Sequence, residues 1–297
     1  MHIAAIIGVK DEAELIGPCI ERLQALGVET IVVLDDYSTD GTAEIVAAYE
    51  ARAAGKLWRV EFAPDLKSNL SRTGHVLGPL LEKHKPDWVL FTDADEFWVT
   101  STGDLATLLQ AQTGDGFVVE RFNVPLMSPP FSLVTGFDQK ALLDAPLIVV
   151  RDYLTRAVLE QAPDKRWVTN AIQPKMICRA DRLDAFDPGA HTARSVDGAR
   201  MVTTKLADAV IVHVPLTTPT RFARKVRNTR LFFERWIKEY PGESAWHWKR
   251  WVELDDGGVL LAEFERQLML QDELHVLRQS GVVKSAGEYL AERGGNA

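Results

Sequence analysis

The first hundred residues alternate short apolar runs with segments of helical periodicity, and this alternation limits the possible folds more than any other feature. Four apolar runs have the length of a strand: 3–9, 30–35, 57–62 and 88–95. Three segments between them carry apolar side chains at helical spacing: 12–26, 41–54 and 67–85. Strands that alternate with helices pair in parallel through right-handed crossovers. The sequence therefore predicts an α/β fold, a mostly parallel sheet flanked by helices.

Acidic side chains follow three of these strands. They are Asp11 and Glu12 after the first, Asp35 and Asp36 at the end of the second, and Asp93, Asp95 and Glu96 after the fourth. Carboxyl ends of parallel strands meet at one edge of a sheet, where ligands bind, so these acids are expected to gather there. A buried strand that ends in carboxylates is costly unless a cation or a donor neutralises them. Asp93 and Asp95 are two apart and would point to one side of a continuing strand, an arrangement that suits a divalent metal.

The pattern changes after residue 98. Four more strands are predicted: 116–124, 147–153, 175–179 and 209–214. Thr218 as N-cap with Pro219 behind it predicts a helix start, and that helix runs to about residue 240. A further helix is predicted near 258–279, and a loosely packed end over 281–297. We therefore predict a sheet domain over 1–215 and a helical C-terminal extension over 216–297.

Composition excludes several classes of protein. The chain has 297 residues, of which 46% are hydrophobic and 26% charged, as in an ordinary globular protein. A formal net charge of −8 argues against a general nucleic-acid binder. Cys19 and Cys178 form neither a disulfide framework nor a zinc pattern. No apolar run is long enough to cross a membrane and no secretory signal is present, so we expect a cytoplasmic protein.

The second acidic strand end has the most distinctive motif, Asp35-Asp36-Tyr37-Ser38-Thr39-Asp40-Gly41-Thr42. Taken alone, it fits equally a hydrophilic turn with a capping Asp40 and a site where Asp35 or Asp36 accepts from a nucleobase or a ribose hydroxyl. With Lys10-Asp11-Glu12 before it and Asp93-Ala94-Asp95 after it, the motif resembles the GT-A-fold glycosyltransferases related to family 2. The sequence Asp95-Glu96-Phe97 resembles a bacterial subgroup of that family. The resemblance covers about residues 1–100, with Lys10-Asp11 in place of the common Asn-Glu.

The resemblance implies a GT-A-like, Rossmann-related sheet and a nucleoside diphosphate sugar as donor. It implies that Asp35 and Asp36 hold the base or ribose, and that Asp93 and Asp95 hold Mn²⁺ or Mg²⁺ against the diphosphate, since hard cations prefer oxygen ligands. His213, at the end of an apolar strand, is the further candidate metal ligand. The remaining candidates for donor binding are Asp11, Glu12, Arg72, Lys175 and His191.

Transfer to a hydroxyl by inversion requires a carboxylate near the acceptor. Glu96 lies beside the metal motif, and Asp138 lies in the Pro- and Gly-rich segment 125–146, so both are candidate catalytic residues. Glu120 and Asp187 stay open beside them. The family suggests a glycan or a growing polysaccharide as the acceptor.

The helix that starts at Pro219 has a basic face and is followed by tryptophans. The basic residues are Arg221, Arg224, Lys225, Arg227 and Arg230. One interpretation is peripheral membrane contact through 219–251, at the inner face of the membrane. Another is an amphipathic helix packed on the sheet with a solvated basic face. A third is that the aromatic residues stack on the sugar of an acceptor.

Two alternatives come from other classes of protein. A phosphohydrolase of the haloacid dehalogenase type also uses paired aspartates after a strand, but its Asp-x-Asp-x-Thr motif follows the first strand, and Asp93-Ala94-Asp95 lacks that Thr. A non-catalytic nucleotide-sugar-binding protein would not need both Asp93 and Asp95. A dinucleotide-binding enzyme is disfavoured because the first loop lacks G-x-G-x-x-G.

Overall fold

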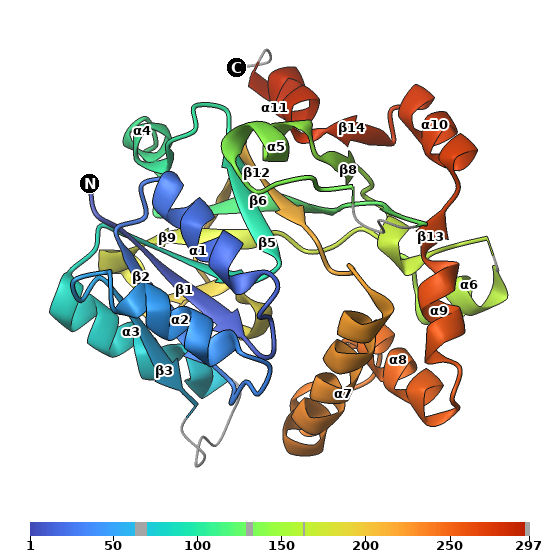
Figure 1. The fold of residues 1–297 in the computed structure, drawn as a ribbon. Helices are drawn as coiled ribbons and strands as arrows, with labels where there is room; N and C mark the ends of the chain where they lie inside the picture. Colours follow the sequence, from blue (N-terminus) through green and yellow to red (C-terminus); the bar gives the residue numbers. More distant parts are fainter. Residues whose placement is uncertain (63–69, 129–132, 163, 295–297) are drawn as a thin grey trace.

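The computed structural model describes residues 1–62, 70–128, 133–162 and 164–294. The side chain of Arg72, a candidate for donor binding, lies outside the part of the chain that the structure describes. An eight-stranded sheet forms the centre, in the order β3-β2-β1-β4-β9-β6-β12-β5, with helices packed against it (Figure 1). Six strands run in one direction, and β9 and β5 run against their neighbours. The predicted α/β fold with a mostly parallel sheet is confirmed.

The N-terminal half of the sheet is built from alternating strands and helices. Its elements are β1 (Ile3–Val9), α1 (Ile16–Ala25), β2 (Thr30–Asp35), α2 (Thr42–Glu50), β3 (Leu57–Glu61), α3 (Leu70–His84) and β4 (Trp88–Asp93). Side chains of β1 alternate between two cores: Ile3, Ala5 and Ile7 pack toward α1, whereas Ala4 and Ile6 pack toward α3. The first strand is therefore buried on both faces, which explains its continuous apolar run.

The second half of the sheet has four strands, two of which, β5 and β9, run against the others. The four strands are β5 (Glu96–Thr100), β6 (Gly116–Asn123), β9 (Lys175–Arg179) and β12 (Thr204–His213). The prediction of one strand through Asp95 is wrong, because β4 ends at Asp93 and the chain turns at Ala94 and Asp95. β5 then pairs with β12 at the far edge of the sheet, with Glu96 opposite His213. The turn therefore brings the acidic motif beside His213, although 117 positions separate Glu96 from it in sequence (213 − 96).

Smaller elements connect these strands. They are α4 (Leu105–Gln110), β7 (Leu126–Met127), α5 (Gln139–Asp144), β8 (Pro146–Ile148), α6 (Arg156–Gln161), η1 (Trp167–Thr169), η2 (Ala180–Arg182), β10 (Leu183–Phe186), η3 (Pro188–Ala190) and β11 (Ala193–Ser195). The strand predicted over 147–153 is thus three residues long and begins at Pro146. The capping residue of α2 also differs from the expectation, because Gly41, with φ of 97°, is the N-cap in place of Asp40.

The C-terminal part begins with α7 (Pro219–Trp236), which Thr218 caps as predicted. It continues through η4 (Ile237–Glu239), α8 (Trp246–Asp256), α9 (Leu260–Arg266), β13 (Leu268–Met269), α10 (Gln271–Gln279), β14 (Val283–Ser285) and α11 (Ala286–Gly294). The helix predicted over 258–279 is thus two helices, α9 and α10, separated by β13.

The last described residues are also packed, contrary to the prediction of a loose end. β14 pairs with β8, and Tyr289 and Leu290 of α11 are buried in the main core. Within the described part of the chain, no helix is both long and apolar enough to cross a membrane.

Candidate active site

A cavity of about 740 Å³ opens at the edge of the sheet where the parallel strands end. Its walls include the ends of β1, β2 and β4, with Lys10, Asp36 and the turn Asp93–Asp95. α7 and α8 supply the opposite wall. The acidic strand ends therefore meet at one edge, as the topology requires, and a ligand-sized space lies against them.

Asp93 is held by a buried lysine. Its Oδ2 accepts a hydrogen bond of 2.7 Å from Nζ of Lys175, which is fully buried yet lines the cavity. Burial raises the pKa of Asp93, but the charge of Lys175 outweighs it and lowers the pKa below its ordinary value. Lys175, a predicted donor-binding residue, is therefore in place beside the predicted metal motif.

Glu96 lies beneath the turn instead of facing the cavity. It is 1% exposed, and its Oε2 accepts from the backbone N–H of Asp93 at 2.9 Å and from Thr92 Oγ1 at 3.1 Å. Arg121 and Lys175 pair with the same carboxylate. Burial raises the pKa of Glu96. Its contacts fix the turn, so the structure does not place Glu96 where an acceptor hydroxyl would lie.

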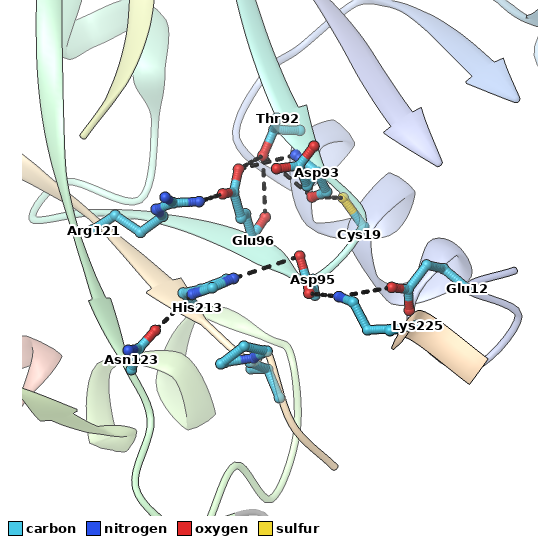
Figure 2. Close-up of polar contacts among 12 residues, drawn as sticks. Glu12, Cys19, Thr92, Asp93, Asp95, Glu96, Arg121, Asn123, His213 and Lys225 are labelled. Atoms are coloured by element: carbon cyan, nitrogen blue, oxygen red, sulfur yellow. Dashed lines mark hydrogen bonds and ion pairs between the residues drawn. The ribbon is translucent and has the colours of Figure 1, made fainter. Parts of the chain in front are cut away.

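Asp95 and Glu12 share two cations from α7. Asp95 Oδ2 accepts from Lys225 Nζ at 2.5 Å and from Arg221 Nη2 at 3.2 Å. Glu12 accepts from Arg221 Nε at 2.8 Å, and its Oε1 lies 3.0 Å from Lys225 Nζ. Burial would raise the pKa of Asp95, but Lys225 above all holds the pKa well below its usual range. Figure 2 shows Lys225 between the two carboxylates.

His213 faces Asp95 across a short gap. Its Nε2 lies 3.8 Å from Asp95 Oδ1, and its Nδ1 lies 2.7 Å from Asn123 Oδ1 (Figure 2). The Asn123 amide donates to the Val168 carbonyl at 3.0 Å, so its oxygen faces the imidazole. Burial lowers the pKa of His213 well below its ordinary value, which favours the neutral ring. The Nδ1–H therefore donates to Asn123 and leaves the Nε2 lone pair toward Asp95.

This pair of acceptor atoms tests whether a divalent ion fits. A carboxylate oxygen and an imidazole lone pair that face each other are suitable ligands for Mn²⁺, and the bond from Nδ1 to an amide oxygen orients the ring as in many metal sites. Among the described residues no three His, Cys, Asp or Glu side chains converge on one metal position. The described chain thus offers two ligand atoms at this point, one oxygen and one nitrogen. This number fits an ion that takes its other ligands from a phosphate-bearing substrate.

Asp11 and Asp35 shape the neighbouring loop. Asp11, with φ of 52°, accepts from the Thr39 amide at 2.6 Å and from Asn228 Nδ2 at 2.9 Å. Asp35 is fully buried and accepts from Ser38 Oγ at 2.6 Å and from Arg59 Nη1 at 2.8 Å. Neither lines the cavity, whereas Asp36 and Glu12 do. Asp35 and Asp11 therefore hold the loop that presents Asp36.

Two other candidates occupy different positions. His191 lines the cavity, and its Nδ1 lies 2.8 Å from the Pro174 carbonyl oxygen; burial lowers its pKa to about 3. Asp138 is not a cavity residue: it caps α5 by accepting from the amides of Lys140 and Ala141 at 2.9 and 3.0 Å. Asp138 therefore lies outside the described wall of the cavity, and its catalytic role stays a prediction.

Sequence analysis missed Arg121 and gave Arg221 no role in the site. Arg221 is fully buried although it belongs to a basic helix face. Its spacing of four from Lys225 places both on one side of α7, toward Glu12 and Asp95. That spacing, together with three acidic strand ends that need cations, is the signal that could have identified Arg221 as a partner of the acidic residues.

Comparison with known proteins agrees with this geometry. The chain matches the model of glycosyl transferase family 2 over residues 4–164, more than half of its length, and belongs to that family. The predicted resemblance is confirmed, and the haloacid dehalogenase alternative is not supported. The fold is the α/β sheet flanked by helices that was predicted, with a mostly parallel strand order.

Among solved structures, the chain is similar to TarS from S. aureus, with 18% identity and a TM-score of 0.37, over 61% of this chain and 47% of that one. It is also similar to the mannosyltransferase PcManGT from Pyrobaculum calidifontis in complex with GDP-Man and Mn²⁺. That match has 16% identity and a TM-score of 0.39, over 99% of this chain and 86% of that one. The chain thus spans about half the length of the TarS segment 1–349, and 28% of the longer TarS chain. No curated protein matches the chain.

Proposed function

We propose that this protein transfers a sugar from a nucleoside diphosphate sugar to a hydroxyl group of a glycan acceptor. The observation that carries the proposal is the turn Asp93–Asp95 in the cavity wall, with Lys175 bound to one carboxylate and Lys225 to the other. A diphosphate beside this turn would meet both ammonium groups. Inversion at the sugar is the outcome that the resemblance to family 2 implies.

The donor would lie along the ends of β1, β2 and β4. Lys10 Nζ donates to the Asp36 carbonyl at 2.5 Å and holds the turn after β2 against the first loop. Asp36, on the cavity wall, is the carboxylate of this turn that is placed to accept from a base or a ribose hydroxyl. Asp35 would support it from behind through Ser38 and Arg59.

Asp95 and His213 are the residues that would hold Mn²⁺ or Mg²⁺, with Asp93 beside them. When bound, the ion supplies Lewis-acid stabilisation of the negative charge on the diphosphate. The chain's own part is electrostatic: Lys175 and Lys225 place positive charge where the leaving diphosphate gains negative charge. Asn123 keeps the His213 ring in the orientation that a ligand needs.

Glu96 and Asp138 receive no proton-transfer role in this proposal. Glu96 is buried beneath the turn and paired with Arg121, and Asp138 caps α5. Glu96 instead acts through the backbone of Asp93, which it holds in the turn. It is therefore a positioning residue.

A membrane surface is likewise not part of the proposal. Of the six basic residues of α7, four are paired with acids of this chain: Arg221, Arg224, Lys225 and Arg230. Arg227 is exposed, and its Nε donates to the carbonyl of Ala223. The basic face that suggested contact with anionic lipid is thus directed mainly into the protein.

The test measures nucleoside diphosphate released from UDP-, GDP- and dTDP-sugars, with a mixture of simple glycosides as acceptors. We expect release from one donor class, and a loss of about a hundredfold or more in Asp95→Asn, because that carboxylate organises the charges around the diphosphate. Asp184→Asn is the matched control, since Asp184 is exposed on β10 away from the cavity.

Three results would contradict the proposal. Equal rates in the wild-type protein and Asp95→Asn would show that the Asp95 carboxylate takes no part in the reaction. Phosphate release from phosphomonoesters, without sugar-nucleotide turnover, would indicate a phosphohydrolase. Donor binding without turnover under any acceptor would indicate a binding protein.

A further inference from the structure

The cavity continues beyond the Asp93–Asp95 turn into an end walled by aromatic side chains. We call this the aromatic end; it comprises Trp167, Phe222, Trp246, His247, Trp248 and Trp251. These residues come from η1, α7 and α8, and Figure 1 shows α7 and α8 side by side below the sheet. Donor binding, as proposed above, uses none of them.

A buried floor supports the aromatic end. Trp251 is 1% exposed and its ring centroid lies 4.8 Å from Trp167, 4.9 Å from Trp248 and 5.0 Å from Phe222, in edge-to-face contacts. Trp251 Nε1 donates to Glu263 Oε1 at 3.3 Å. The floor is therefore fixed by packing and a hydrogen bond before any ligand arrives.

The upper rings keep part of their surface free. Trp246 and Trp248 are half-buried, whereas Trp167 and Trp251 are buried. His247 stacks on Trp167 with centroids 5.1 Å apart and lies edge-to-face with Trp246. Trp246 and Trp248 thus keep accessible aromatic surface at the wall of the cavity.

Charge is distributed unevenly along the cavity. Its four basic wall residues each contact the donor end: Lys10 at the Asp36 carbonyl, Arg121 at Glu96, Lys175 at Asp93 and Lys225 at Asp95. At the aromatic end, the charged residue among the described wall residues is Glu243, in the turn before α8. No cation of the described chain pairs with its carboxylate. This end would repel an anion.

Polar groups with unmet hydrogen bonds accompany the rings. The indole Nε1 of Trp167 is buried and has no hydrogen-bond partner in the part of the chain that the structure describes. Glu243 is exposed, and no donor of the described chain bonds its carboxylate, so a ligand can replace the water on it. Because the Trp167 nitrogen is closed off from solvent, Glu243 is the charged group that a ligand can reach at this end.

We propose that the aromatic end is the acceptor subsite and that it takes an uncharged saccharide. This rests on the proposed function, because it assigns the acceptor for that same cavity. Trp246 and Trp248 are the stacking surfaces, and Glu243 accepts hydrogen bonds from sugar hydroxyls.

A sugar ring matches this wall both through the C–H groups on its faces and through the hydroxyl groups around its edge. Its C–H faces carry partial positive charge and are apolar, which suits the negative face of an indole ring. Its hydroxyls donate to carboxylates such as that of Glu243. A lipid chain would bury the Glu243 carboxylate without a partner, and an anionic head group would be repelled by it.

The test is direct binding of the full-length protein to an array of uncharged oligosaccharides, with vesicles of phosphatidylglycerol as the competing class. We expect at least one uncharged oligosaccharide to bind, and Trp248→Ala or Trp246→Ala to weaken binding about tenfold through loss of the stacking surface. Glu243→Gln should weaken the same binding several-fold. Glu234→Gln, an exposed acid on α7 outside the cavity, should leave it unchanged.

Three outcomes would overturn the inference: no oligosaccharide binds, binding survives in Trp246→Ala, Trp248→Ala and Glu243→Gln, or the vesicles bind instead and these changes abolish that binding. If the tryptophan variants do not fold, Glu243→Gln alone decides, since it changes one exposed turn residue. Calorimetry with sugar nucleotides separates the two proposals. A protein that binds donor but no oligosaccharide refutes the subsite and leaves the transferase proposal standing.

Discussion

The buried cations of α7 allow a quantitative prediction. Arg221→Met removes a guanidinium that is 0% exposed and that bonds Glu12, Asp95 and the carbonyls of Val214 and Pro215. Methionine fills much of the volume but supplies no donor. Two carboxylates and two carbonyl oxygens lose a partner in a dry environment.

Removing one partner of a buried ion pair costs about 3–5 kcal/mol. Lys225 stays within 3.0 Å of Glu12 and within 2.5 Å of Asp95, so part of the negative charge remains neutralised. We therefore expect a loss near the lower limit, about 3 kcal/mol. Against a total stability of about 5–15 kcal/mol this is large. It would lower the melting temperature by about 6 °C or more.

Urea unfolding followed by circular dichroism measures the loss, and Arg227→Met is the control on the same helix. Arg227 is exposed and should change stability by less than about 0.5 kcal/mol. The double variant Arg221→Met with Lys225→Met should lose more than the sum of the single losses, by about 1 kcal/mol, because each cation compensates for the other. An Arg221→Met protein as stable as Arg227→Met would refute the account of these charges.

Three further predictions concern the rest of the molecule. Lys175→Met leaves Asp93 and Glu96 with one cation fewer, so it should lower the free energy of unfolding by about 3 kcal/mol, as measured in urea. It should also weaken nucleoside diphosphate binding at least tenfold. A variant as stable as the wild-type protein would contradict this prediction. The pKa of Asp95 is lower in the folded than in the unfolded state, so its stabilisation is present above its ordinary pKa of 3.8 and is lost as pH falls below it. The urea midpoint should therefore fall less steeply in Asp95→Asn than in the wild-type protein between about pH 5 and pH 3. Tyr289→Ala in α11 should cost about 3–4 kcal/mol, since the ring is 4% exposed and packs on Phe122 at 5.0 Å; a change under about 1 kcal/mol would indicate a loose C-terminus.

The sequence was sufficient to predict the edge of the sheet that carries the site. Continuous apolar runs identify strands buried on both faces, and parallel strands end together. For this reason the sequence alone predicts that Asp36, Asp93 and Asp95 lie in one region. Their roles as ligands stay predictions.

The turn after Asp93 could not be predicted, because the residues after it continue the apolar pattern of a strand. The reversal depends on Glu96, whose carboxylate holds the Asp93 amide and pairs with Arg121 and Lys175. These partners lie on β6 and β9, far away in sequence. A contact that distant leaves no local signal, so Glu96 was interpreted as a catalytic group.

The C-terminal segment shows a similar limit. Residues 286–294 have few apolar side chains, and the pattern indicated a loose end. In the structure Tyr289 and Leu290 complete the main core beside β12, so tertiary packing decides what local composition does not. The basic face of α7 was interpreted as solvated for the same reason, since its acidic partners come from the first loop and from the turn after β4.

The most direct test of the central claim is calorimetric titration of the wild-type protein with UDP-, GDP- and dTDP-sugars, each with and without Mn²⁺. We predict that sugar nucleotides of one base bind, and that Mn²⁺ strengthens the binding through Asp95 and His213. Asp95→Asn should remove the effect of Mn²⁺. No binding by any sugar nucleotide, with or without Mn²⁺, would contradict the account.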